Sequence, residues 1–182
     1  MGSRHLKVVF GATMFAGLFC LLVAAIPPEK AGAATTVRTC GGESLSLKAR
    51  EKRTLSLHNA ARTSRGLRPL CADPRLTRAA RSHSRQMIEK DYMAHASHNG
   101  ESVRERLERF GYHRSVYAEN IAGGSGQPGK PGSIFRRWMD SLPHRTNILD
   151  GRFRPVGVGS YTGNYKGTRG YTMYTVDFGV RG

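Results

Sequence analysis

The sequence predicts an α+β fold, in which helices flank a sheet without a regular alternation of strand and helix. Two observations support this prediction. Helical patterns with capping residues occupy the middle of the 182-residue chain, and two segments rich in β-branched and aromatic residues lie near its C-terminus. Once the N-terminal segment is set aside, the remaining length fits one domain.

The N-terminal segment has the composition of a secretory signal. Arg4 and Lys7 precede an uncharged run over residues 8–26, and a stretch of small residues follows. We therefore expect a signal peptide over residues 1–34 and a secreted, extracellular protein. The run over residues 8–26 is also long enough to span a bilayer, so anchoring to the cell membrane by this segment is the alternative.

Removal of this segment would leave two cysteines, Cys40 and Cys71. Two cysteines in an oxidising compartment predict one disulfide between them. The whole chain has a formal net charge of +16, which favours anionic partners such as wall polymers or lipid head groups. A solvated, arginine-rich surface is the other interpretation. We expect no nucleic-acid partner, because export removes the usual target and no known nucleic-acid module is present.

The first elements follow from breakers and caps. The sequence predicts a short extended segment over residues 35–50. It also predicts a first helix over residues 47–65, which stops at Gly66. A loop is expected over residues 67–71.

The second helix has the clearest signals, because Asp73 can cap it and Pro74 fits its first turn. Its apolar residues recur at helical spacing, and arginines gather on another side. These arginines, which we call the arginine face, are Arg75, Arg78, Arg81 and Arg85. The helical pattern fades near Asp91.

Further along, Ser102 can cap a short helix that Gly111 stops. Residues 115–122 have the composition of a strand, and residues 123–132 are too rich in Gly and Pro for regular structure.

The last elements are a helix and a hairpin. Ser133 is expected to cap the helix and Pro143 to end it. Residues 156–161 and 171–178 predict two strands, joined by the turn-rich segment 163–170.

Three polar residues lie where these elements end or a loop begins: His95, Glu119 and His144. Imidazole and carboxylate groups bind divalent metals or transfer protons near neutral pH. If the fold brings them together, they form a polar site without a strong nucleophile. The alternative is a purely structural role, in which these three side chains hydrogen-bond one another and the backbone and so hold loops together.

Other polar residues have simpler structural interpretations. His58 and Asn59 are expected to tether a neighbouring loop, His83 to be a satisfied core histidine, and Arg145 to be a structural hydrogen-bond donor. Trp138 lies in an apolar helical stripe and is expected in the core.

Six short motifs occur in a recognisable order: L-H-N-A-A-R, M-A-H-A-S, Y-A-E-N-I-A, W-M-D-S-L-P-H-R-T-N-I-L, V-G-V-G and Y-T-V-D-F-G. Together they resemble the CAP superfamily, also called the SCP domain, in its secreted bacterial branch. The resemblance places the domain at residues 51–182. It implies a three-layer α-β-α sandwich with a central antiparallel sheet. It also implies a cleft lined by two histidines and two acidic residues, which holds a divalent metal in some members.

Carried over to this chain, the resemblance implies that His95, Glu119 and His144 lie in one cleft. Ser97 and Asn120 are expected beside them as ligand-binding residues. The fourth, acidic residue is missing, since Ser141 stands where the eukaryotic branch has Glu. A metal such as Zn²⁺ would be held by the two histidines together with the glutamate, with an open position for water.

These observations lead to one main hypothesis, a secreted, non-enzymatic and monomeric module that binds a divalent metal or small ligand. Its partner would be an unidentified envelope or extracellular ligand, such as a lipid or an anionic polymer. One alternative is a metal-dependent hydrolase of peptide or cell-wall material. The H-E-x-x-H and G-x-S-x-G motifs are absent, and we assign no catalytic residue. The other alternative is an anionic-polymer binder that uses the arginine face.

Overall fold

The computed structural model describes Gly2 and residues 35–181, so the expected signal peptide, apart from Gly2, lies outside the described residues. Within the described part, no helix is long and apolar enough to cross a membrane. In chain order the elements are β1 (Thr35–Arg38), β2 (Ser44–Leu47), α1 (Ala49–Thr63), β3 (Cys71–Ala72), α2 (Pro74–Glu89), α3 (Val103–Arg109), β4 (Tyr117–Gly124), α4 (Pro131–Asp140), α5 (Leu142–Leu149), β5 (Pro155–Tyr165) and β6 (Thr168–Gly179).

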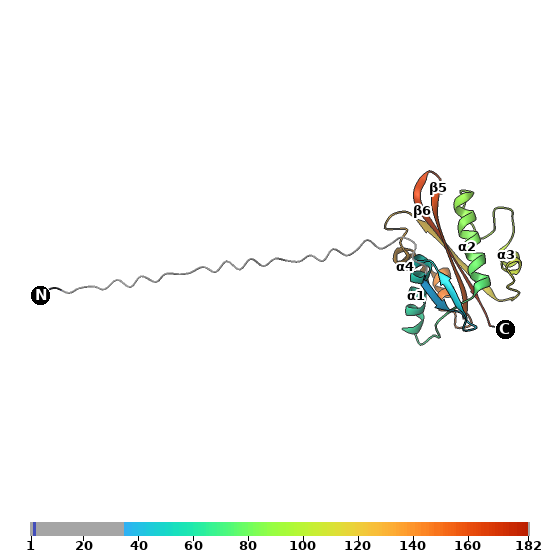
Figure 1. Ribbon diagram of the computed structural model, residues 1–182, viewed down its shortest axis with the longest axis horizontal. Helices are drawn as coiled ribbons and strands as arrows, with labels where there is room; N and C mark the ends of the chain where they lie inside the picture. The colour runs from blue at the N-terminus through green and yellow to red at the C-terminus, as the bar shows by residue number, and fades with distance from the viewer. Residues whose placement is uncertain (1, 3–34, 182) are drawn as a thin grey trace. The chain divides into compact units, whose positions relative to one another are not determined.

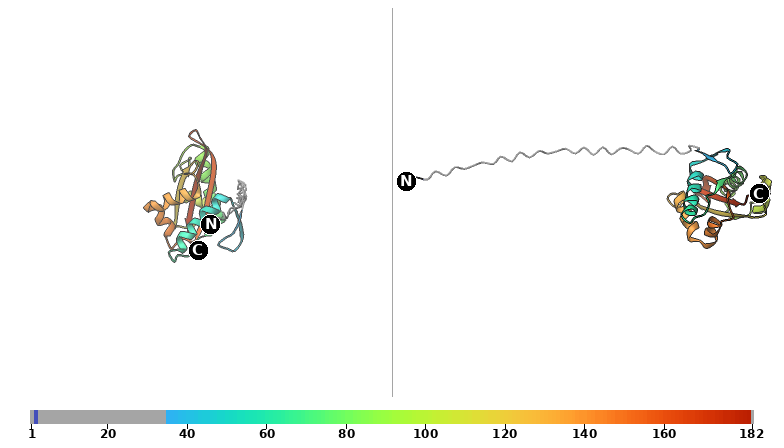
Figure 2. Two further views of the ribbon diagram at one scale, coloured as in Figure 1. Left: turned by 90° about the vertical axis from the view of Figure 1, so that its left-hand side faces the viewer. Right: turned by 90° about the horizontal axis from the view of Figure 1, so that it is seen from below.

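A four-stranded sheet in the order β3-β5-β6-β4 forms the middle layer. β4, β5 and β6 are antiparallel neighbours, whereas the short β3 runs parallel to β5. The helices α2 and α3 lie on one face, and α1, α4 and α5 lie on the other (Figure 1). Figure 2 shows these layers from two further directions. The predicted α+β sandwich is confirmed, with one parallel pair that was not expected.

The V-G-V-G motif on β5 explains how α2 approaches the sheet so closely. Successive residues of a strand point to opposite faces. Gly157 and Gly159 therefore share the α2 face, and a Cβ atom at Gly157 would lie 2.0 Å from the carbonyl carbon of Leu76. Val156 and Val158 point the other way, into the main core. Glycine at two alternating positions is thus what lets the helix backbone rest on the strand.

The main apolar core lies on the opposite face, under α1 and α4. Trp138 is 1% exposed there and donates its indole N–H to the carbonyl oxygen of Ile121 at 3.1 Å. Both properties confirm it as a core residue. Because the donor belongs to α4 and the acceptor to β4, this bond also fixes the edge strand against its helix.

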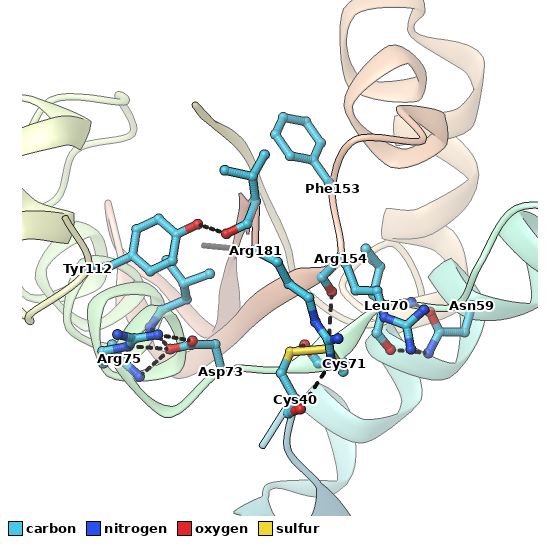
Figure 3. The surroundings of a disulfide bond; sticks show 12 residues. Cys40, Asn59, Leu70, Cys71, Asp73, Arg75, Tyr112, Phe153, Arg154 and Arg181 are labelled. Carbon is cyan, nitrogen blue, oxygen red and sulfur yellow. Dashed lines mark hydrogen bonds and ion pairs between the residues drawn. A yellow bond between two sulfur atoms is a disulfide. The ribbon is translucent and has the colours of Figure 1, made fainter. Parts of the chain in front are cut away.

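The predicted disulfide between Cys40 and Cys71 is confirmed. It joins the two-stranded lead of β1 and β2 to β3, and Thr39 extends the connection as an isolated bridge to Ala72. Figure 3 shows the disulfide beside the Asn59–Leu70 contact. Asn59 donates to and accepts from the backbone of Leu70, at 3.0 and 2.7 Å, which is the expected loop tether. His58 does not take part, because its Nδ1 lies 2.8 Å from the carbonyl oxygen of Thr54 within α1.

Two helix starts form as their caps predict. The Asp73 carboxylate accepts from the backbone N–H groups of Arg75 and Leu76, at 2.8 and 3.3 Å. Ser102 and Glu105 form a reciprocal capping box at the start of α3. The residues that cap each helix lie within a few positions of its start, so the local sequence was sufficient to predict both helix starts.

The prediction for the segment between α4 and α5 was wrong. Ser133 does not cap α4, which starts at Pro131, and α4 ends at Asp140. Pro143 lies in the first turn of a separate helix, α5, where its missing N–H costs no hydrogen bond. His144 is therefore a helical residue.

The hairpin is longer than predicted. β5 and β6 continue past residues 161 and 171 and almost meet at Lys166 and Gly167, which both have positive φ.

Candidate functional site

Glu119 on β4 is the centre of a buried ionic cluster on the α2 face of the sheet. Its side chain is 2% exposed, and its Oε1 lies 2.7 Å from Nδ1 of His95. Its Oε2 accepts from Arg106 of α3, whose side chain is 1% exposed. Burial opposes ionisation of Glu119, but the His95 hydrogen bond and the charge of Arg106 outweigh it and lower the pKa. Glu119 is therefore an ionised carboxylate with both oxygens engaged.

His95 lies in the loop after α2 and is the solvent-facing member of the cluster, with 55% of its side chain exposed. The hydrogen bond to Glu119 raises its pKa above the ordinary histidine value. Two buried side chains hold the loop: Arg106 donates to the His95 carbonyl oxygen at 3.0 Å, and His83 lies 2.9 Å from that of Ala94. The position of the imidazole is thus set from both α2 and α3.

His83 is buried, as expected, but it belongs to this cluster. Its Nε2 lies 4.0 Å from Oε2 of Glu119, and its Nδ1 has no partner among the described residues. Burial lowers the pKa of His83 to about 4, against the opposing effect of the Glu119 charge. It is accordingly a neutral imidazole at pH 7.

Asp177 is the functional candidate that sequence reasoning missed. It is the cross-strand partner of Glu119 on β6, and it is fully buried. Both of its carboxyl oxygens lack a partner among the described residues. Burial, reinforced by the Glu119 charge, raises the pKa of Asp177 well above its ordinary value. The available signal was a single acid inside the apolar, β-branched run Y-T-V-D-F.

His144 approaches from α5, on the other side of β4. Its Nδ1 lies 2.7 Å from Oγ of Ser141, and its backbone carbonyl accepts from Asn120 at 3.0 Å. Asn120 in turn accepts from Asn147 at 2.9 Å. Burial and the nearby charge of His95 both lower the pKa of His144. This side of the site is neutral.

The side chains expected at the cleft therefore divide between two faces. Asn120 follows Glu119 directly, so it points to the opposite face of β4, where it holds the backbone of His144. Ser97 is buried beside Arg106 and bonds to Glu101 and Arg106, at 3.1 and 3.0 Å. Neither points a free polar group toward the two histidines, and both act as supports.

Comparison with known proteins identifies the domain. The model of the CAP family, described as the cysteine-rich secretory protein family, matches residues 55–178. This chain belongs to the CAP family. The resemblance noted from its motifs is thereby confirmed.

Several similar proteins are bacterial. The uncharacterized protein YkwD of Bacillus subtilis is 38% identical over 114 residues, which are 63% of this chain and 43% of YkwD. An extracellular protein containing an SCP domain from Bacillus anthracis has a TM-score of 0.63 at 27% identity, over 73% of this chain and 40% of that one. The chain therefore spans less than half of either relative. An outer surface protein from Borrelia burgdorferi shares the fold, with a TM-score of 0.63 at 16% identity over 82% of this chain and 100% of that one.

The metal set expected for this CAP domain fits only in part. Glu119 uses one oxygen on Arg106 and the other on His95. Across the described residues, no group of three or more His, Cys, Asp or Glu side chains could hold a metal ion. The part that fits is the support of His95, whose imidazole is oriented from behind by the Glu119 carboxylate, as outer-shell carboxylates orient histidine ligands in metal sites.

The arginine face of α2 is largely neutralised within the CAP domain. Its ion pairs are Arg75 with Asp73 at 2.7 Å, Arg81 with Glu51 at 2.6 Å and Arg85 with Glu89 at 2.6 Å. Arg78 donates to the carbonyl oxygen of Phe110 at 3.4 Å. Three of the four guanidinium groups thus have an internal counter-ion, which weakens the idea that this helix attracts anionic polymers.

Proposed function

We propose that this CAP domain is a binding module that takes a small ligand through the Nε2 atoms of His95 and His144. One observation carries the proposal. Each imidazole is fixed through Nδ1, by Glu119 in one case and Ser141 in the other, while no described residue bonds to either Nε2. Two rings oriented from behind, with their outer nitrogens free, are prepared to bind rather than merely to hold loops together.

The charges of the two rings suggest the class of ligand. The raised pKa of His95 favours its cationic form, and the lowered pKa of His144 favours its neutral form. The pair offers one charged donor and one neutral nitrogen that donates or accepts. A carboxylate or similar anionic group matches these two functions.

The surroundings of the histidines add an apolar component. Met93 and Leu142 are the two exposed large hydrophobic side chains of the described residues, 51% and 66% exposed. Met93 lies in the loop two positions before His95, whereas Leu142 and His144 are two positions apart on α5 and point to different sides of that helix. We therefore propose a small amphipathic anion, with its head group on the imidazoles and its apolar part against Met93. A divalent metal with two nitrogen ligands is the second candidate, favoured by the carboxylate behind His95.

A hydrolytic role has less support from the described residues. Glu119 is held between Arg106 and His95 and cannot act as a free base. Ser97 bonds to Arg106 and Glu101. Ser141 contacts His144, but no third group orients that imidazole, as a nucleophilic triad requires.

The experiment is a calorimetric titration of octanoate and, separately, of Zn²⁺ into the wild type and the His95→Ala/His144→Ala double variant. His113→Ala is the matched control, because His113 is an exposed histidine with no side-chain hydrogen bond in the structure. We expect saturable heat with octanoate for the wild type and the control, and none for the double variant. Heat with Zn²⁺ alone would select the metal candidate. Equal heats for all three proteins with both ligands would exclude the cleft.

We also propose that the domain works outside the cell. The Cys40–Cys71 disulfide supports this location, because such bonds persist in oxidising compartments. The sequence of residues 1–34 has signal-peptide character. N-terminal sequencing of protein recovered from culture medium and from membranes tests the proposal. A mature N-terminus near Ala34 in the medium supports cleavage, whereas an intact N-terminus in the membrane fraction supports the anchor.

A further inference from the structure

The β5–β6 hairpin presents a group of tyrosines on the α2 face of the sheet, near the C-terminal end of α2. Tyr165 and Tyr171 are tilted neighbours with ring centroids 4.7 Å apart. Tyr161 lies on the same face of β5, further from the turn, where it pairs with Met173. All three are partly exposed and pack against the small cluster of Met87, Ile88 and Met173. Figure 1 shows this hairpin at the top of the sheet, beside one end of α2.

Two glycines make room for Tyr171 and for the side chain of Ile88 beneath the tyrosines. A Cβ atom at Gly123 would lie 2.4 Å from Cε1 of Tyr171, so this ring lies directly over the β4 backbone. A Cβ atom at Gly163 would lie 2.5 Å from Cγ2 of Ile88. Because both positions lack a side chain, the Tyr171 ring and Ile88 pack directly against the sheet, and Ile88 belongs to the cluster on which the tyrosines rest.

Cations surround the tyrosines. Lys166 lies 5.5 Å from the centre of the Tyr165 ring, and Arg85 and Lys48 lie 5.8 and 6.0 Å from that of Tyr161. Between residues 161 and 171 there are two cations and no acid, the second cation being Arg169. The nearby carboxylates have partners, since Glu89 pairs with Arg85 and Asp91 accepts from the Lys166 backbone N–H at 2.6 Å.

The chemistry of this surface favours a polar, anionic partner over a purely apolar one. Neither of the two exposed large hydrophobic side chains in the described part of the chain belongs to the hairpin. Aromatic rings attract partially positive groups to their electron-rich faces, and the C–H face of a pyranose ring presents such groups. Lysine and arginine bind carboxylates. We propose that the hairpin surface of Tyr161, Tyr165, Tyr171, Lys166 and Arg169 binds a linear polysaccharide that carries carboxylate groups.

This proposal is independent of the histidine cleft, and it locates anionic-polymer binding on the hairpin instead of the arginine face of α2. The mature-length protein is therefore tested against polygalacturonate by affinity electrophoresis at low salt. We expect the His95→Ala/His144→Ala variant to bind it like the wild type, so that failure of one proposal leaves the other intact.

The stacking component is tested with Tyr165. Tyr165→Ala should weaken binding by about tenfold, as the loss of one stacked aromatic contact predicts. Tyr165→Phe should keep the wild-type affinity, because the ring and not the hydroxyl makes the contact. Equal affinities for the Ala variant and the wild type would overturn the assignment of this surface. Unchanged melting temperatures check that both variants fold.

The charge component needs a matched control. Lys166→Ala/Arg169→Ala removes two charges from the hairpin, and Lys52→Ala/Arg53→Ala removes two exposed charges from α1. We expect the hairpin pair to lose at least tenfold in affinity and the α1 pair less than threefold. Equal losses would show diffuse attraction to the net charge and would overturn the proposal.

The same variants are measured with other anionic partners. Vesicles containing phosphatidylglycerol and an oligothymidylate present negative charge without a pyranose surface. Tighter binding of either probe than of polygalacturonate, with the same sensitivity to Tyr165→Ala, would assign the hairpin to lipid or nucleic acid and reject the polysaccharide. Weaker binding of both probes supports it.

Discussion

At Glu119 and Asn120, the two faces of β4 hold their polar side chains by different kinds of interaction. Glu119 faces α2 and α3 and is held by charges, with Arg106 as its buried counter-ion. Asn120, the next residue, faces α5 and is held by neutral amide and carbonyl groups. Each face positions one cleft histidine. The ionic face supports His95, and the amide face supports His144.

The two faces also differ in how completely their hydrogen bonds are satisfied. Among the described residues, the ionic face contains buried polar atoms without partners: Nδ1 of His83, Nε of Arg106 and both carboxyl oxygens of Asp177. None of the side chains of Asn120, Asn147 or Ser141 has such an atom. Unsatisfied buried groups reduce stability, and they concentrate at functional sites. We infer that the amide face is mainly structural, whereas the ionic face tunes the site.

The largest effect should come from Arg106→Met. This change leaves the Glu119 carboxylate buried without its counter-ion, which should destabilise the domain by about 3–5 kcal/mol. Chemical denaturation at pH 7 measures it. A loss below about 1 kcal/mol would mean that water replaces the arginine, and the ionic face would then be no more sensitive than the amide face.

The ionic face should also respond to acid through His83. Its folded pKa of about 4 lies below the ordinary 6.5, so only the unfolded state takes up this proton as the pH falls from about 6.5 to 4. As the pH falls over that range, the free energy of unfolding should therefore decrease by up to about 3 kcal/mol. His83→Gln should flatten this part of the curve of unfolding free energy against pH. An equally steep curve in the variant would assign the acid sensitivity to other groups, such as the buried His58.

On the amide face, Asn120→Ala should cost about 1–3 kcal/mol, because the His144 carbonyl and the Asn147 amide each lose a partner. Unlike the change at His83, this loss should be nearly constant between pH 4 and 7, since Asn120 bonds only to an uncharged backbone carbonyl and an uncharged amide. Denaturation at both pH values is the measurement. A strongly pH-dependent loss would contradict the division between the two faces.

The smallest effect is expected for Asp177→Asn. The folded pKa of Asp177 is raised, so the stability that its neutral form contributes is present below the unfolded value of 3.8 and is lost as the pH rises toward the folded pKa. At low pH, the free energy of unfolding of the variant should be within about 1 kcal/mol of the wild-type value. Between pH 5 and 8, the variant should become more stable relative to the wild type. A loss of more than about 2 kcal/mol would show that an ionised Asp177 is paired with Arg106.

Local signals predicted much of the scaffold and part of the site. The cap at Asp73, the capping box at Ser102 and the core position of Trp138 all depend on residues close in sequence. The start of α5 at Leu142 was missed, because a proline that ends one helix also fits the first turn of the next. The motifs predicted one site for the two histidines, Glu119 and Asn120. In the structure His95 contacts Glu119, His144 contacts Ser141, and Asn120 points to the opposite face of β4 from Glu119.

The sequence by itself determined the family, the order of the main elements and the disulfide, because each of these is encoded by a short motif or by a simple count. Only the tertiary structure decided that Asp177 lies beside Glu119, that Arg106 neutralises it, and that the hairpin tyrosines share one face. These contacts depend on strand register and on the distance of α3 from the sheet. Register and helix placement result from packing over the whole domain, so no local pattern contains them.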